Sequence, residues 1–369
     1  MRIVQVANFV APTSGGLRTA LGHLAEGYGR HGHEVVQILP GPVDGELVTP
    51  WGRRVNLRAP ALAHTGYRIL ADRDRLGQAL RRYHPDVLEV HDRTTLRWLG
   101  RWARARGVPS LVVSHERLDR WLGQWLPTGL PLEALADRSN GALARDFDTV
   151  VCTTDWAAEE FRRLHVPRLV VVPLGVDAAT FGYRITGSAD ERSDAVALVM
   201  ASRLDREKRP GIAVDTVREL RRRGVDARLV VAGDGPLRRR LQAAARDLPI
   251  EWPGFVADRA LLARLMTTAD VALAPGPVET FGLAALEALA CGTPVVANSS
   301  SALPGVIGPR AGLAAEGDGR SFADAVQELL ALPEAPRRAS ARARAEQFSW
   351  SATVQGFLAV HAAVPAAPR

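Results

Sequence analysis

The segment SRLDREKRP (202–210) contains a single lysine in an arginine-rich chain. Lys208 is the only lysine among 47 basic residues, and the other 46 are arginine. It lies five positions after Arg203, which ends the apolar run VALVMASR, and two before Pro210, a residue tolerated in the first turn of a helix. We therefore expect Arg203, Lys208 and a helix N-terminus to converge on a diphosphate. An ammonium is more compact than a guanidinium fork, so a narrow slot already holding Arg203 favours lysine.

Two glutamates eight positions apart lie in PGPVETFGLAALEALACGTPVVA (275–297). Glu279 and Glu287 bracket the start of an expected helix, which Gly292 and Pro294 end. As a glycosidase pair they would act as acid and base. As a binding set they would accept hydrogen bonds from sugar and ribose hydroxyls. Each alone also fits an ordinary helix, with Glu279 as a dipole partner in the first turn and Glu287 exposed.

Histidines follow two apolar runs in the first half of the chain. His115 comes directly after LVVS (111–114), and His91, Asp92 and Arg93 come after LEV (88–90). A histidine at a strand end can hydrogen-bond a hydroxyl or stabilise developing charge, and it can equally be a local structural hydrogen bonder.

Paired glycines, Gly15 and Gly16, follow the first apolar run and would let a backbone approach a phosphate or sugar closely. A dinucleotide fingerprint is absent, because the sequence has no G-x-G-x-x-G here and no acidic residue ends the second run, VVQILPG. This argues against an NAD-dependent oxidoreductase.

These residues must be positioned by strands that alternate with amphipathic helices, a pattern typical of parallel α/β sheets. In the first half we expect strands near 2–7, 34–39, 86–90, 109–114, 148–152 and 168–172, and helices near 17–30, 69–82, 94–106, 132–145 and 155–164. After a turn-rich linker (175–195) we expect strands near 195–201, 227–232, 250–252, 270–274 and 294–297, and helices near 210–223, 236–246, 259–267, 282–290, 320–331 and 348–364.

The chain length of 369 residues suits two domains. We expect an α/β protein with two doubly wound Rossmann-like domains, residues 1–180 and 181–349, with the helix at 350–369 packing back on the first. Ligands of such sheets bind at the carboxyl ends of the strands, so a site between the domains is expected.

The composition excludes several other classes. Hydrophobic residues make up 47% and charged residues 24%, as in soluble globular proteins. No apolar run approaches the ~20 residues of a membrane span, no signal peptide is expected, and two cysteines favour the cytoplasm. The acidic pair of DRD (72–74) is expected in mid-helix at the surface, so no metal is predicted.

A net charge of +7 predicts an anionic partner. Nucleic acid is not favoured, because no recognition motif is found. The arginine-rich segment 53–106, including RILADRDRLGQALRRY and LRWLGRWARARG, predicts either a solvated helix face or contact with an anionic membrane. Trp121 and Trp125 in LDRWLGQWLPTGLPL would insert at a headgroup interface or pack in the core or in a groove.

Taken together, these motifs resemble the GT4-type retaining glycosyltransferases of the GT-B fold, in which two Rossmann-like domains face a central cleft. The resemblance rests on Glu279-x7-Glu287, Arg203 with Lys208, VAGDGPL (231–237), VVPLGVD (171–177) and the glycine pair. The N-terminal half is similar to actinobacterial GDP-mannose-dependent phosphatidylinositol-dimannoside mannosyltransferases.

The resemblance implies a role for each residue. Arg203 and Lys208 would neutralise the donor diphosphate, His115 would lie beside the reacting sugar, and Glu279 would hold sugar hydroxyls. The remaining donor contacts would come from Gly15, Gly16, the backbone of Phe281, Gly282 and Leu283, and the ribose-binding Glu287, and the acceptor contacts from His91, Asp92 and Arg93. One departure is Gly305 in SSSALPGVIG, where the family commonly has a glutamate.

The implied function is metal-independent transfer of a hexose, best assigned as mannose from GDP-mannose, to a glycolipid such as a phosphatidylinositol mannoside. The enzyme would lie peripherally on the inner face of the plasma membrane, and its oligomeric state is not determined by the sequence. One alternative is a soluble acceptor with a UDP- or GDP-sugar. Another is a nucleotide-sugar epimerase or a non-catalytic nucleotide-sugar binder of the same fold.

Overall fold

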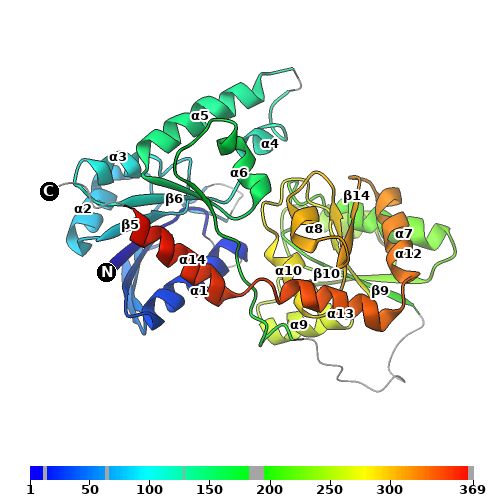
Figure 1. The fold of residues 1–369 in the computed structure, drawn as a ribbon. Coiled ribbons are helices and arrows are strands. Elements are labelled where there is room, and N and C mark those ends of the chain that lie inside the picture. The colour runs from blue at the N-terminus through cyan, green and yellow to red at the C-terminus, as the bar shows by residue number, and fades with distance from the viewer. Residues whose placement is uncertain (11–14, 63–65, 128, 183–194, 365–369) are drawn as a thin grey trace. The chain divides into compact units, whose positions relative to one another are not determined.

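The computed structural model describes residues 1–10, 15–62, 66–127, 129–182 and 195–364, and the chain forms two compact units. The first comprises Met1–Leu174 with the segment from Trp350 to the C-terminus, and the second comprises Gly175–Ser349 (Figure 1). Most of the expected linker lies outside the described residues. The described helices include none whose length and apolar character suffice to cross a membrane.

The first unit contains an eight-stranded sheet between two layers of helices. Its strands are β1 (Arg2–Val6), β2 (Glu34–Gly41), β3 (Gly45–Thr49), β4 (Gly52–Arg58), β5 (Val87–Val90), β6 (Ser110–Ser114), β7 (Thr149–Cys152) and β8 (Leu169–Val171). Their order is β3-β4-β2-β1-β5-β6-β7-β8, parallel except for β3. Its helices are α1 (Gly16–Arg30), α2 (Arg73–Tyr83), α3 (Trp98–Arg104), α4 (Leu118–Leu122), α5 (Leu132–Asp146), α6 (Asp155–Arg162) and α14 (Trp350–Ala363).

The hairpin of β3 and β4 was not expected from the sequence. Residues 53–58 lie in the arginine-rich segment 53–106 and were assigned no element, but they pair in register with β2, from Val36 opposite Arg53 to Gly41 opposite Arg58. The reason is that Val55 and Leu57 alternate with polar residues over a stretch too short to stand out. At the sheet edge Leu47 and Val48 are exposed, so β3 lacks the buried apolar pattern of a core strand.

Helix α2 begins four residues later than expected, and DRD does not lie in mid-helix. Asp72 is the N-cap, and its side chain accepts a hydrogen bond of 2.9 Å from the backbone N–H of Arg75. Asp74 lies in the first turn, where its charge complements the helix dipole. The aspartates therefore start the helix.

The second unit contains a six-stranded parallel sheet in the order β11-β10-β9-β12-β13-β14. Its strands are β9 (Val196–Ala201), β10 (Ala227–Ala232), β11 (Ile250–Gly254), β12 (Val271–Ala274), β13 (Val295–Asn298) and β14 (Gly312–Ala315). Its helices are α7 (Gly211–Arg222), α8 (Arg238–Ala244), α9 (Arg259–Thr267), α10 (Leu283–Ala290), α11 (Leu303–Ile307), α12 (Gly319–Leu330) and α13 (Glu334–Ala345).

Helix α13 was missed because its buried face consists of two arginines and two alanines, Ala341 and Ala345, and has no large apolar side chain. Arg337 and Arg338 are 6% and 2% exposed. The guanidinium of Arg338 donates to the carbonyls of Thr267 and Ala269, at 3.1 and 2.9 Å, and so supplies the end of α9 with donors. A periodicity search for apolar residues cannot recognise such a face.

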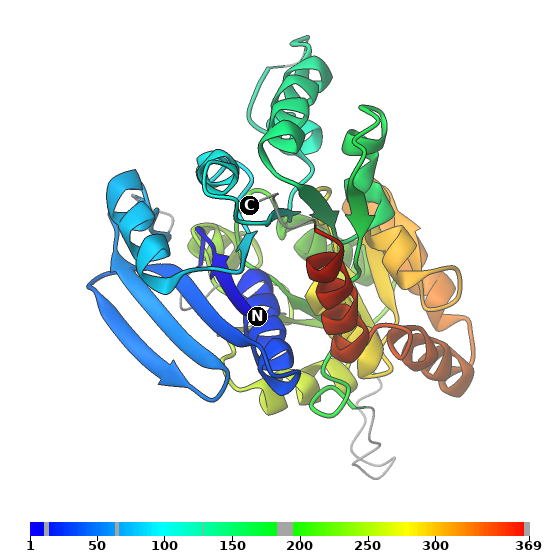
Figure 2. The ribbon, with the colours of Figure 1, turned by 60° about the vertical axis from the view of Figure 1, so that its left-hand side comes forward.

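Helix α14 returns to the first unit and lies along α1 (Figures 1 and 2). The ring of Trp350 stacks on His23 with centroids 4.4 Å apart, and His361 meets Tyr28 edge to face at 5.4 Å. The two helices approach closely at Gly27, where an added Cβ would overlap the side chain of Val354.

This close approach can be tested with a pair of alanine substitutions in α1. Gly27→Ala and Gly22→Ala share the gain in helix propensity of about 1 kcal/mol, but an added Cβ at Gly22 meets no atom within 4 Å. Overpacking costs about 1–3 kcal/mol, so Gly27→Ala is expected to be less stable than Gly22→Ala by that amount in urea unfolding. Equal stabilities would contradict the packing of α14 on α1.

Candidate functional site

In the second unit, the loops after β9 and β10 pack backbone against backbone. Arg203 lies in the first loop, and Gly233 and Gly235 flank Asp234 in the second. A Cβ on either glycine would overlap the carbonyl of Ser202 or Leu204. The tight turn therefore holds the β9 loop in place at the carboxyl end of the sheet.

Lys208 and Glu279 form an ion pair between the loops after β9 and β12. The side chains are 23% and 22% exposed. Burial lowers the pKa of Lys208, but the adjacent Glu279 carboxylate outweighs it, so the pKa lies above its ordinary value. The ammonium therefore stays charged. The backbone N–H of Lys208 donates a hydrogen bond of 3.1 Å to the carboxylate of Asp205.

Arg203 is paired with carboxylates of its own loop. Its guanidinium bonds Asp205 and lies 3.4 Å from Glu207. Its positive charge also acts on the pKa of Lys208, lowering it, so the two cations lie within electrostatic reach of each other. The tertiary structure thus brings together residues predicted from two separate motifs: Arg203 and Lys208 from one, and Glu279 from the other.

The backbone before α10 adopts a conformation that requires glycine. Gly282, the N-cap, has φ 73°, and a Cβ there would overlap Leu303. Phe281 is 4% exposed and packs edge to face on Phe348 with centroids 5.9 Å apart. The Phe281 side chain is thus occupied in the core, which leaves the backbone of residues 281–283 for any ligand contact.

Glu287 is buried, so its interpretation as an exposed helix residue is wrong. Burial raises its pKa to about 7, although Arg259 opposes the shift with an ion pair of 3.0 Å. Arg259 also lies over the ring of Phe181 at 4.7 Å. The sequence analysis missed Arg259, because it is one of many arginines at the start of an ordinary helix.

In the first unit, Gly15 is the N-cap of α1. Among the residues that the structure describes, no atom lies within 4 Å of a Cβ built on Gly15. The proposed approach of Gly15 and Gly16 to a ligand therefore stays a prediction.

His115 and His91 are joined at the ends of neighbouring strands. Nδ1 of His91 lies 3.0 Å from Nε2 of His115, and the rings are stacked with centroids 5.2 Å apart. Burial, together with the charge of His91, lowers the pKa of His115 to about 3, so this imidazole is neutral near neutral pH.

Asp92 and Arg93 bond within the protein. Asp92 accepts from the backbone N–H groups of Thr94 and Thr95, at 2.8 and 3.1 Å. Buried Arg93 pairs with Glu160 and bonds Asn140. Arg93 also donates to Ser114 Oγ at 2.9 Å and to the carbonyl of Glu116 at 3.0 Å. These last two bonds hold the chain on both sides of His115, and acceptor contact by these residues stays a prediction.

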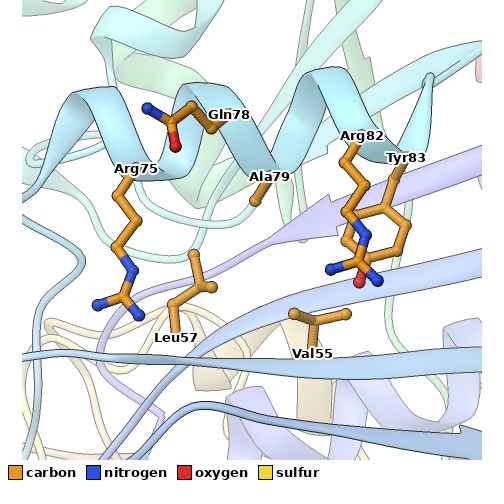
Figure 3. A pocket seen from close by; sticks show the side chains of 7 residues that line it. All are labelled: Val55, Leu57, Arg75, Gln78, Ala79, Arg82 and Tyr83. Atoms are coloured by element: carbon orange, nitrogen blue, oxygen red, sulfur yellow. The ribbon is translucent and has the colours of Figure 1, made fainter.

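Two hollows lie away from these residues. One of about 230 Å³ lies between β4 and α2 (Figure 3) and is lined by Val55, Leu57, Arg75, Gln78, Ala79, Arg82 and Tyr83. The other, of about 510 Å³, lies beside α11 and includes Gly305 and Arg344. Neither contains a predicted site residue. Across the described part of the chain, no group of three or more His, Cys, Asp or Glu side chains is placed to hold a metal.

Comparison with known families identifies both units. Residues 15–175 match the family described as glycosyl transferase 4-like domain, and residues 186–346 match glycosyl transferases group 1. The two doubly wound sheets confirm the predicted GT-B fold class. The chain belongs to the GT4-type glycosyltransferases and is an enzyme of that class.

Among its curated relatives is the GDP-mannose-dependent alpha-(1-6)-phosphatidylinositol dimannoside mannosyltransferase of Mycobacterium tuberculosis (strain ATCC 25177 / H37Ra). The two are 46% identical over 375 residues, which cover 100% of this chain and 98% of the relative. The D-inositol 3-phosphate glycosyltransferase of Saccharomonospora viridis is 32% identical over 311 residues, 71% of this chain and 72% of that protein.

Solved structures show the same fold at low identity. The sucrose-phosphate synthase of Thermosynechococcus elongatus superimposes with a TM-score of 0.79 at 21% identity, covering 98% of both chains. An Anabaena protein in complex with UDP and glucose gives a TM-score of 0.75 at 16% identity, covering 98% of this chain and 100% of that one.

Replacing Lys208 tests the cationic site. Lys208→Ala is expected to lower sugar transfer on the order of 100-fold or more, because removing one preorganised donor typically costs that much, while the melting temperature changes little. Lys208→Arg is expected to remain impaired, since the planar guanidinium group of arginine is wider than an ammonium. Arg246→Ala, which removes an exposed charge from the same unit, is the control. Near-normal transfer by Lys208→Ala would contradict the role.

The raised pKa of Glu287 predicts a pH effect on stability. The pKa of Glu287 rises from 4.5 to about 7 on folding, so the folded state binds the proton more tightly than the unfolded state. The free energy of unfolding therefore falls as pH rises between these two values. Glu287→Gln should therefore gain stability relative to the wild type between pH 4.5 and 8, by at most about 3 kcal/mol. Urea unfolding as a function of pH measures it, with exposed Glu328→Gln as control. Parallel profiles would contradict the shift.

Proposed function

We propose that this enzyme transfers mannose from GDP-mannose to a phosphatidylinositol mannoside, with retention of the anomeric configuration and without a metal. The observation that carries the proposal is the paired Lys208 and Glu279 at the strand ends. They lie in a chain that is 46% identical, over its whole length, to a relative named for this donor and this acceptor class.

On this proposal the second unit binds the nucleotide-sugar. Arg203 and Lys208 bind the diphosphate, Glu279 accepts bonds from sugar hydroxyls, and Glu287 accepts them from the ribose. The backbone of residues 281–283 lines the sugar and phosphate. The first unit supplies the acceptor side, and Gly15, Gly16 and His115 are its proposed substrate contacts.

The ion pair of Lys208 and Glu279 suits a site that must accept a diphosphate. When the phosphate binds the ammonium, Glu279 exchanges Lys208 for a sugar hydroxyl, so the ammonium keeps an anionic partner and the carboxylate keeps a hydrogen-bond donor. The bond between the sugar C1 and the phosphate oxygen then breaks. The acceptor oxygen forms a new bond to C1 on the same face, and its proton passes to the leaving phosphate. Arg203 and Lys208 offset the charge that develops on the leaving group.

An apolar surface near α4 and α5 supports a lipid acceptor. Trp121 and Trp125 are 37% and 50% exposed, and Leu126, Leu130 and Leu135 are also exposed. Of the alternatives for these tryptophans, burial in the core is wrong for Trp125, which is half exposed, and packing in a groove stays untested. We propose that this surface and the arginines of residues 53–106 hold the enzyme peripherally on an anionic membrane, at the cytoplasmic face.

A second candidate uses a water-soluble acceptor. It is supported by the relative named D-inositol 3-phosphate glycosyltransferase, which is 32% identical over 71% of this chain. The two candidates share the donor machinery and differ in the acceptor alone, so an acceptor assay separates them.

Nucleotide and acceptor preference test the proposal directly. GDP at 100 times its Kd should stabilise the protein by about 2.7 kcal/mol, read as a rise in melting temperature, while UDP at the same concentration should give less. Radiolabelled mannose from GDP-mannose should appear in a lipid-extractable product when a phosphatidylinositol mannoside is present. Labelled inositol phosphate would support the second candidate, and donor interconversion without acceptor would indicate an epimerase.

Co-sedimentation with anionic vesicles tests the proposed membrane association. We expect binding that decreases as the salt concentration rises, and no binding to anionic vesicles would contradict the proposal.

A further inference from the structure

Arg259 contacts both an aromatic ring and a buried carboxylate in the second unit. One of its guanidinium nitrogens lies 3.0 Å from Oε1 of Glu287, and the guanidinium carbon lies 4.7 Å from the centroid of the Phe181 ring. The side chain of Glu287 is 11% exposed, and Phe181 is fully buried. A cation over an aromatic face at this distance is attracted by the ring. Two directional contacts therefore fix the guanidinium.

Both partners of Arg259 are anchored to helix α10. Glu287 is part of this helix, and Arg342 binds the end of the helix by donating to the carbonyl of Ala290 at 2.9 Å. The same nitrogen of Arg342 donates to the carbonyl of Phe181 at 3.3 Å. The ring and the carboxylate are thus held by one helix, and Arg259 joins them from the start of α9.

Arg259 also favours the charged form of Glu287. Burial raises the pKa of Glu287, the charge and the hydrogen bond of Arg259 lower it, and the charge of Asp177 raises it, with a result of about 7. Removing Arg259 would therefore raise the pKa of Glu287 further, because burial and Asp177 would act unopposed by this cation.

The remaining elements packed on α10 are α11, α13, β12 and β13. Helix α13 carries Arg338 and Arg342, whose guanidiniums bond backbone carbonyls. The other three elements contain no charged residue. Cys291 directly follows α10, and burial raises the pKa of its thiol to about 11, so the thiol is neutral.

The two oxygens of the Glu287 carboxylate differ in their contacts. Oε1 accepts from Arg259, whereas Oε2 has no hydrogen-bond partner among the residues that the structure describes. The bond to Oε1 restricts rotation of the carboxylate, because rotation would break it. Oε2 is therefore an oxygen of defined direction that a ligand hydroxyl can bond.

We infer that Arg259 is a positioning residue that holds Oε1 of Glu287 and so leaves Oε2 to bond a ribose hydroxyl of the nucleotide. The inference rests on the proposed function for the place of the ribose. The orientation by Arg259 does not depend on the charge of Glu287, but the strength of the ribose bond does, because a charged acceptor bonds more strongly than a neutral one. The ribose is common to GDP and UDP, so the inference holds for either base.

The test compares the binding of GDP and 2′,3′-dideoxy-GDP to the full-length chain, by calorimetry at pH 8. The ratio of the two Kd values measures the bonds of the ribose hydroxyls, since base and diphosphate are the same in both ligands. We expect the wild type to prefer GDP by about 10-fold or more, the worth of a hydrogen bond to a charged group, and Arg259→Met to prefer it by about 3-fold or less. No preference in the wild type, or an unchanged preference in Arg259→Met, overturns the inference.

The pH dependence of this ratio gives a readout that a merely structural role would not change. The wild-type preference for GDP should fall as pH falls through about 7, because protonation removes the charge from Glu287. In Arg259→Met the fall should occur at higher pH, since the pKa of Glu287 is raised further. Titration of the diphosphate cancels in the ratio. Equal pH profiles in the two proteins overturn the inference.

A double substitution shows whether Arg259 acts through Glu287. In the Glu287→Gln background, Arg259→Met should have little further effect on the preference for GDP. If it lowers the preference there as much as it does in the wild type, Arg259 acts on the nucleotide directly and the inference fails.

Arg264→Met is the matched control, because it removes an exposed arginine from the same helix α9. Its preference for GDP should equal that of the wild type, and a loss as large as in Arg259→Met would overturn the inference. Arg259→Lys keeps the positive charge and should retain more of the preference than Arg259→Met does. Should Arg259→Met not fold, Arg259→Gln is also neutral and carries the same prediction.

Binding and transfer together separate this inference from the proposed function. If the wild type binds GDP but transfers no mannose, the proposed function fails, while the ratio of Kd values still decides the inference. If the wild type transfers mannose and Arg259→Met keeps the full preference for GDP, the inference alone fails. If the wild type binds neither GDP nor UDP, both fail.

Discussion

The ion pair between Lys208 and Glu279 is the interaction on which the candidate donor site depends. It joins loops 71 residues apart at the carboxyl ends of β9 and β12. A partly buried ammonium is stable next to a carboxylate, and the carboxylate is stable next to a cation. Each can exchange the other as a partner when a ligand binds. The tight contacts of Gly233 and Gly235 with the β9 loop hold it at the same sheet edge. These backbone contacts therefore help to hold the loop that carries Lys208 close to Glu279.

In the first unit, charged side chains are likewise paired, and these pairs are more deeply buried. Arg93 pairs with Glu160, and Glu89 lies among two histidines, Tyr28 and Gln5. Each of these charged groups is therefore paired or hydrogen-bonded within the protein itself. Arrangements of this kind leave polar atoms at strand ends with defined directions, which is the property that recognition of a polyhydroxylated sugar requires.

Family membership and local geometry answer different questions about this enzyme. The full-length match defines a glycosyltransferase and its GT-B fold, and the contacts show how individual side chains are prepared for that chemistry. Glu287 illustrates the difference. Its position in the motif follows from the sequence, whereas its pKa of about 7 and its bond to Arg259 arise from burial against α9.

The sequence by itself determined the βα alternation, the strand ends and the motif residues, because buried parallel strands and helix limits leave local patterns. It also singled out Lys208 by composition alone. The tertiary structure decided which groups meet: the partner of Lys208, the burial of Glu287, the hairpin β3–β4 and the link from His361 through Glu89 to His115. Such contacts join residues far apart in the chain. Their energies depend on burial and direction, and neither is written in the spacing of residues.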